Sequence, residues 1–240
     1  MGGITDPSFA STCLNEGAGM VAIGGYPIGT EMIGSCYQMI GRGRREFVLP
    51  IGEEANKIND LFQLFKKNVD LTSVMVNLRF NDPSYAQSFV KDFSNLMGER
   101  PVIEINAHCR QPEVTNCGGG QALLHRKEVL KRIIGVFHAK DFPISLKFRG
   151  NAIPSREFIP TVIQLPLEFL HIDSYRIGEA GTDLELLRFY AQSITASLIG
   201  NNSIIDRASA EAVLEAGASY FSLARAAEKN PSIFQTLKNI

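Results

Sequence analysis

A cysteine and three glycines follow an apolar segment near the middle of the chain. Residues 102–105 read Val-Ile-Glu-Ile, and Asn106 and Cys109 follow before the glycines at 118–120. Glycines let a backbone approach a ligand closely, and loops that leave parallel strands carry the active sites of barrel enzymes. A thiol on such a loop can transfer a proton if its pKa suits the working pH. This segment is therefore the first candidate for chemistry.

Other polar residues lie inside or just after apolar runs. Asn77 lies in the run 74–78, and Lys147 is flanked by apolar residues within 144–148. Each has an ordinary alternative: a strand-end lysine can reach solvent, asparagines can cap loops, and most free cysteines are small buried hydrophobes. The surrounding elements decide between these interpretations.

Short β-rich runs alternate with longer amphipathic segments along the chain, which predicts βαβ units and a parallel sheet. Predicted strands cover residues 20–24, 73–78, 102–105, 143–147, 168–172, 196–199 and 220–223. Predicted helices cover residues 6–16, 52–67, 83–97, 123–139, 155–163, 183–192, 208–216 and 231–238.

The regular spacing favours one α/β domain over residues 1–240, folded as a (β/α)8 TIM barrel. Residues 1–4 would form a shortened first strand, and residues 47–50 would add an extra strand. The runner-up architecture is an open doubly wound sheet.

Composition narrows the class of protein. The formal net charge is −1, whereas a dedicated nucleic-acid binder is more often basic. Four cysteines without a CxxC or zinc spacing indicate reduced thiols and no metal site. Without a signal peptide or an apolar run of membrane-span length, we expect a soluble, cytoplasmic protein. The oligomeric state, including a homo-oligomer, stays open.

An ordered series of motifs resembles the tRNA-dihydrouridine synthase family. The segment 106–124 matches the family's Asn, Gly-Cys-Pro and Gly-rich run ending in Ala-Leu-Leu. The other similar segments are residues 3–9, 76–78 with 82–83, 145–149, 200–204, and 224–226 with 230–231. Related FMN barrels, the dihydroorotate dehydrogenases, also place an Asn and a Cys after a strand in this way.

The resemblance implies an FMN enzyme with defined roles for these residues. Lys147 would stabilise the negative charge of reduced flavin near N1. Cys109 would transfer a proton to one carbon of a double bond while the flavin delivers hydride to the other. The remaining contacts would come from Asn77, His171 and Asp173 to the cofactor, and from Asn106 and Arg149 to the substrate.

The FMN phosphate is expected at the loops after the seventh and eighth barrel strands. Backbone N–H groups and a helix N-terminus bind anions there, and an arginine adds forked donors. These loops contain Gly200, Asn201, Asn202, Ala224 and Arg225.

The chain also departs from the family pattern. Gly-Cys-Pro is His108-Cys109-Arg110, and Asp173 stands where the His of a His-Gly-Arg is expected, with His171 two residues earlier on the same strand face. Several glycines of the phosphate loops are replaced, by Asn202, Ser203, Ala224 and Ala226. The chain ends at Ile240, before the helical domain with which the synthases grip tRNA.

The sequence thus supports an FMN-dependent oxidoreductase that reduces the C5–C6 double bond of a uracil-type ring, with Cys109 as proton donor. The substrate would be a small pyrimidine or tRNA, and a reduced nicotinamide would be a suitable electron donor. Two alternatives remain open. One is a dihydroorotate dehydrogenase-like enzyme for small molecules, which the missing helical domain favours. The other is a non-catalytic barrel that has lost FMN binding, which the altered phosphate loops favour.

Overall fold

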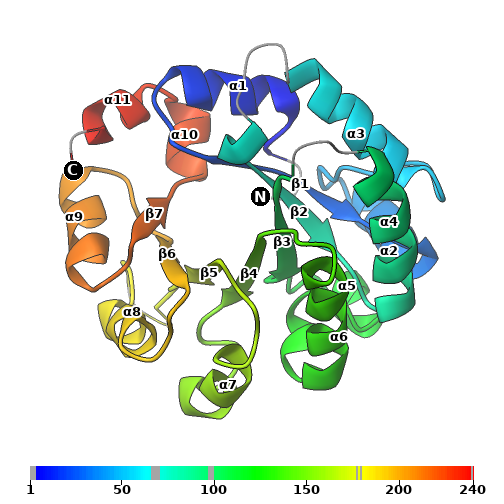
Figure 1. The fold of residues 1–240 in the computed structure, drawn as a ribbon. Coiled ribbons are helices and arrows are strands. Elements are labelled where there is room, and N and C mark those ends of the chain that lie inside the picture. The colour runs from blue at the N-terminus through cyan, green and yellow to red at the C-terminus, as the bar shows by residue number, and fades with distance from the viewer. Residues whose placement is uncertain (1–3, 66–70, 97–99, 177, 179, 239) are drawn as a thin grey trace.

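The strands of the computed structural model form one parallel sheet that curls around a central axis (Figure 1). The structure describes residues 4–65, 71–96, 100–176, 178, 180–238 and 240. The strands are β1 (Val21–Pro27), β2 (Val74–Arg79), β3 (Val102–Ala107), β4 (Ile144–Arg149), β5 (Phe169–Asp173), β6 (Ser197–Asn201) and β7 (Tyr220–Ser222). Each pairs in parallel with the next along the chain, in the order β1 to β7. The predicted α/β, TIM-barrel-like fold is confirmed.

Helices surround the outer face of this sheet (Figure 1). They are α1 (Pro7–Asn15), α2 (Thr30–Gly41), α3 (Glu54–Phe65), α4 (Pro83–Leu96), α5 (Pro112–Asn116), α6 (Lys127–His138), α7 (Ser155–Val162), α8 (Leu184–Ala191), α9 (Arg207–Glu215), α10 (Arg225–Lys229) and α11 (Ile233–Leu237). Two 3₁₀ turns, η1 (Leu71–Ser73) and η2 (Gly120–Leu124), complete the set. Within the described ranges, none of these helices has both the length and the apolar character needed to cross a bilayer.

Apolar side chains between the sheet and the helices hold the frame rigid. Strands β2 and β3 are buried along their whole length, as expected for parallel strands covered by helices. Aromatic rings continue this core outward: the rings of Phe89 and Phe93 stack at 5.0 Å, and those of Phe80 and Phe137 lie 5.7 Å apart. The core therefore fixes the strands, and with them the side chains that point into the barrel.

The structure differs from expectation at the start of the chain. Residues 1–3 of the predicted first strand lie outside the described residues, and Ile4 forms a turn. The Thr5 carbonyl accepts a hydrogen bond from Gly24 of β1 at 3.1 Å. Among the described residues no strand pair joins β7 to β1, so the hydrogen-bonded sheet has seven strands rather than eight.

The extra strand predicted at residues 47–50 is wrong, because these residues form an irregular segment. The Phe47 ring lies 5.8 Å from the ring of Tyr26, and Leu49 packs against the core. The run is apolar because its side chains cover the sheet, without pairing to a neighbouring strand.

The prediction also missed α2. Its N-cap is Gly29, with φ 93° and no side-chain cap, so the usual start signal is absent. The buried side chains Met32, Cys36 and Met39 still follow a helical period. This face is buried against α5 and the loop after β3, and that burial stabilises a helix that the capping residues do not predict.

Candidate active site

Strand register brings polar side chains together inside the barrel. Residues two apart on a strand point to the same face. The pairing aligns Glu104 with both Asn77 and Ser145, and aligns Lys147 with both Asn106 and His171. Barrel interiors are usually filled by branched apolar residues. Two rows of buried polar groups on adjacent strands therefore mark this interior as a site.

The Glu104 carboxylate is the centre of this interior. It is fully buried and accepts hydrogen bonds from Asn77 Nδ2 at 2.6 Å, His171 Nδ1 at 2.6 Å and Ser145 Oγ at 3.2 Å. Burial alone would raise the pKa of Glu104, but His171 and Lys147 outweigh it and hold the pKa below its ordinary value. The carboxylate is thus charged. These residues, with Lys147 and Asn106, are called the Glu104 network below.

Lys147 and His171 belong to the row of the network that lies nearer the carboxyl ends of the strands. Lys147 Nζ lies 3.2 Å from His171 Nε2, and Ser222 Oγ lies 2.7 Å from the same nitrogen. An ammonium group only donates, so Nε2 must accept and Nδ1 must carry the proton donated to Glu104. Among the described residues, this contact occupies one of the three Lys147 N–H donors, which leaves two for a ligand.

The same arrangement makes the fold sensitive to acid. Burial, followed by the Lys147 charge, lowers the pKa of His171 to about 4. The unfolded chain binds a proton on this histidine near pH 6.5 and the folded one does not, so stability is lost as the pH falls from about 6.5 to 4. We expect a loss on the order of 2 to 3 kcal/mol over this window, measured by urea unfolding. The slope should flatten in His171→Gln; an unchanged slope there would contradict the assignment.

The loop that carries Cys109 is tied to the Glu104 network. Asn106 Oδ1 accepts hydrogen bonds from the backbone N–H groups of His108 and Cys109, at 3.1 and 3.0 Å. The other half of the amide donates from Nδ2 to Asn77 Oδ1 at 2.8 Å. Asn106 therefore positions the half-buried thiol relative to the strands, and both its amide atoms are engaged.

Gly120 closes this loop from the other side. The Cys109 carbonyl accepts a hydrogen bond from the Gln121 N–H at 2.8 Å, and Gly120 has φ 53°. A Cβ added at Gly120 would lie 2.3 Å from that carbonyl oxygen. The loop thus needs glycine at this position to keep Cys109 where it is.

We expect Gly120→Ala to cost about 2 kcal/mol of unfolding free energy, because the clash is with backbone and φ is positive. The matched control is Gly135→Ala in α6, where an added Cβ meets no atom within 4 Å. That substitution should stabilise the helix by about 0.5 to 1 kcal/mol. Equal effects of the two substitutions in chemical denaturation would show that the close approach at Gly120 is unimportant.

A second polar cluster lies at the carboxyl ends of β3 to β6. Asp173 accepts from Asn202 Nδ2 at 2.7 Å and Arg149 Nη2 at 3.1 Å, and its Oδ2 lies 2.5 Å from His108 Nε2. Burial opposes ionisation, but the hydrogen bonds from His108 and Asn202 hold the pKa of Asp173 below its ordinary value. Burial also lowers the pKa of His108. His108, Arg149, Asp173 and Asn202 are called the Asp173 cluster.

One of the expected phosphate loops has positive φ at two residues that are not glycine. Asn202 and Ser203, where the resembled family has Gly and Asp, have φ 104° and 55°. Gly200 serves packing, because an added Cβ would lie 2.4 Å from Val213 of α9. Asn201 Nδ2 donates to Ser222 Oγ at 2.7 Å, and so joins the two loops. Ala224 and the exposed Arg225 stand at the start of α10, directly after β7.

Sequence reasoning missed several residues of this site. Arg79 is 3% exposed; its Nη1 lies 2.7 Å from Glu46 Oε2 and 3.4 Å from Cys36 Sγ. Burial opposes its charge, but the Cys109 thiol and Glu46 raise the pKa of Arg79. Arg79 follows Asn77 by two residues, on the same strand face, and Glu104 interrupts an apolar strand; both signals were present in the sequence.

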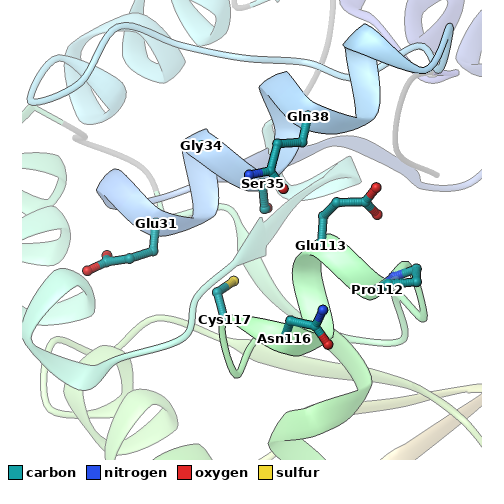
Figure 2. Close-up of a pocket in the computed structure, with 8 residues that line it drawn as sticks. All are labelled: Glu31, Gly34, Ser35, Gln38, Pro112, Glu113, Asn116 and Cys117. Carbon is teal, nitrogen blue, oxygen red and sulfur yellow. The ribbon is translucent and has the colours of Figure 1, made fainter.

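A groove of about 570 Å³ lies between α2 and α5, beside the Cys109 loop (Figure 2). Glu31, Glu113 and Cys117 help to line it, and no member of the Glu104 network does. The Cys117 thiol lies on the α2 side of the loop, with its Sγ 3.1 Å from the Val114 carbonyl. Cys117 thus belongs to the same loop as Cys109, with its thiol directed toward α2.

Comparison with known sequences identifies the family of this chain. The profile described as "Dihydrouridine synthase (Dus)" matches residues 1–164. An uncharacterised protein of Methanocaldococcus jannaschii is 33% identical over 207 residues, 85% of this chain and 78% of that protein. The tRNA-dihydrouridine synthase B proteins of Yersinia pestis and Escherichia coli are each 27% identical over 252 residues, covering this whole chain and 70% of theirs.

Solved structures show the same fold. A DHODH from Eimeria tenella has a TM-score of 0.57 at 11% identity, with 77% of this chain and 63% of that chain covered. A FabK mutant from Thermotoga maritima has a TM-score of 0.55 at 14% identity, with 94% and 60% covered. Both are TIM barrels, and this chain spans less than two thirds of their length. With the profile match over residues 1–164, the chain belongs to the dihydrouridine synthase family of flavin-dependent oxidoreductases.

Proposed function

We propose that this protein binds FMN at the carboxyl ends of its strands and reduces, or in reverse oxidises, a carbon–carbon double bond of a pyrimidine-type ring. One observation carries the proposal. Cys109 follows β3 and Lys147 lies on the adjacent strand β4. Asn106 is in register with Lys147 and accepts a hydrogen bond from the Cys109 backbone N–H. An acid and a buried cation at one barrel mouth are what flavin-mediated reduction of a double bond needs.

The donor set fits a flavin. When bound, FMN supplies hydride transfer, and its reduced form carries negative charge near N1. Lys147 is 6% exposed and has two N–H groups left for such a charge. Asn77 and His171 already form hydrogen bonds within the Glu104 network, and Asp173 does so within its own cluster. We therefore assign these three residues to holding Lys147 and the loops. The phosphate would lie at Arg225 and the 200–202 loop, where the positive φ of Asn202 keeps a glycine-like backbone.

Cys109 performs the proton transfer in this proposal. During reduction the ring gains one hydride and one proton, and the proton leaves Cys109 Sγ as a thiolate forms. The buried guanidinium of Arg79 interacts electrostatically with Cys109. Asn106 keeps the thiol in place through two backbone hydrogen bonds. In the oxidative direction the same thiolate removes the proton.

The Asp173 cluster favours a small substrate. His108 stands where the resembled family has glycine, and it bridges from the Cys109 loop to Asp173 on β5. An imidazole fixed across the mouth leaves less room for a nucleotide in folded RNA than for a free pyrimidine. We therefore propose a small pyrimidine as substrate, with Arg149 beside it, and a reduced nicotinamide as electron donor. tRNA, named for the relatives, is the second candidate.

Flavin absorption is the first test. Purified protein mixed with FMN should show a bound-flavin spectrum and retain the flavin on gel filtration. Turnover with orotate or uracil, but not with unmodified tRNA, would support the small-substrate proposal; the reverse result would support tRNA. If FMN does not bind, the remaining alternative, a barrel without flavin chemistry, takes the place of this proposal.

A further inference from the structure

The Glu104 carboxylate is buried behind the residues assigned to FMN and has no place in the function proposed above. It lies one row deeper than Lys147 and is 0% exposed. Its two oxygens accept three hydrogen bonds, from Asn77, Ser145 and His171. Burying a charge of this kind is costly unless its lone pairs accept hydrogen bonds. We therefore expect the carboxylate to order the side chains around it.

The hydrogen bonds define one orientation of the neighbouring imidazole. With Nδ1–H donated to Glu104, the His171 ring presents the Nε2 lone pair toward Lys147 and Ser222. If the ring carried its proton on Nε2 instead, that N–H would point at the ammonium and repel it. The carboxylate therefore selects the tautomer, and the tautomer holds Lys147.

We propose that Glu104 is a positioning residue, which acts through the tautomer of His171 to fix the Lys147 ammonium against the reduced flavin. This inference rests on the proposed FMN site and adds an explanation of how Lys147 is held in place there. The titratable groups that interact electrostatically with Lys147 are Glu104 on β3, His171 on β5 and His108 after β3. Of these, Glu104 reaches Lys147 through a hydrogen-bonded intermediary.

The sign of a redox effect separates positioning from a direct charge effect. Glu104→Gln keeps the shape, but its amide offers one acceptor oxygen and a donating NH2 group in place of two carboxylate oxygens. It cannot accept from Asn77, Ser145 and His171 together, so the network that holds Lys147 is disturbed. Loss of an ordered cation disfavours reduced flavin, and the midpoint potential of bound FMN should fall. Loss of a negative charge acting directly on the flavin would raise the potential instead.

The experiment is a double-mutant cycle on the FMN-bound protein. Lys147→Met should weaken the preference for reduced over oxidised FMN, and Glu104→Gln should weaken it about tenfold, or about 30 mV for a two-electron couple. In the Lys147→Met background Glu104→Gln should add nothing, because its route is already broken. Glu157→Gln, at an exposed carboxylate paired with Lys127, controls for loss of a negative charge and should leave the potential unchanged. A rise in potential, or an undiminished effect without Lys147, would overturn the proposal.

A second measurement uses the wild-type apoprotein, so it requires neither bound flavin nor a variant that folds. Nitrogen-15 NMR of the wild-type apoprotein should show His171 protonated at Nδ1 and not at Nε2 near neutral pH. A proton on Nε2 would overturn the inference even if FMN binds normally. If FMN fails to bind while His171 shows the expected tautomer, the proposed function fails and the Glu104–His171 contact stands as packing alone.

Discussion

Replacing Cys109 by alanine is expected to abolish turnover while leaving FMN binding intact. The thiol is the proton donor of the proposed reaction, and loss of a general acid costs roughly 10²- to 10⁴-fold in rate. The hydrogen bonds that hold the loop run through the backbone N–H and carbonyl of Cys109, and alanine keeps both. The rate of flavin reoxidation by substrate in a single turnover measures the effect directly.

Cys117→Ala is the matched control, since this thiol lies in the same loop but faces α2. It should bind FMN and reoxidise it at close to the wild-type rate. A Cys109→Ala protein with full activity would remove the acid role from Cys109. Equal losses in both variants would point to a general effect on the loop.

Removing the Glu46 carboxylate is expected to be the most destabilising single change at the barrel mouth. The side chains of Arg79 and Glu46 are 3% and 0% exposed, so Glu46→Ala leaves a buried guanidinium without its carboxylate partner. Breaking a buried pair from one side costs about 3 to 5 kcal/mol. Denaturant unfolding of the two proteins should show this difference in unfolding free energy.

The control substitution removes Arg44, the second arginine that pairs with the Glu46 carboxylate. Arg44 Nε lies 3.4 Å from Glu46 Oε1, and the Arg44 side chain is 43% exposed. Arg44→Ala should therefore change stability by well under 1 kcal/mol. The double variant Glu46→Met with Arg79→Met should recover most of the loss, because no charge is left unpaired. If Arg44→Ala and Glu46→Ala are equally mild, burial does not control this pair.

The sequence predicted the strands well and the irregular parts poorly. Strand β4 alternates apolar and polar residues with a period of two, and β3 is a short β-rich run interrupted by Glu104 and Asn106. The segment from Gly29 to residue 53 was misjudged because its order comes from tertiary contacts. Phe47 packs on Tyr26, and Glu46 pairs with Arg79, 33 residues further along the chain. No local pattern encodes such contacts.

The candidate site was likewise predicted only in part from the sequence. Motif order identified Cys109, Lys147 and Asn106, which the structure brings to one end of the barrel. It did not reveal that Asn77 and Asn106 bind each other, or that Asp173 is held by His108. Those partners lie 29 and 65 residues apart in the chain, and only strand register places them together. Glu104 could have been found, since a lone carboxylate in an apolar strand needs a partner.

The strand order has a consequence for how the chain assembles. Each strand after β1 pairs with the one that precedes it, so each βα unit can dock on a finished neighbour during synthesis. Only the two ends of the ring must meet across the full length: Gln235 Nε2 on α11 donates to Glu16 Oε2 at the end of α1, 219 residues away, at 2.7 Å. Figure 1 shows α1, α10 and α11 side by side at this junction. We expect closure here to be the slow, late event of folding, and the place where the ring first opens under denaturant.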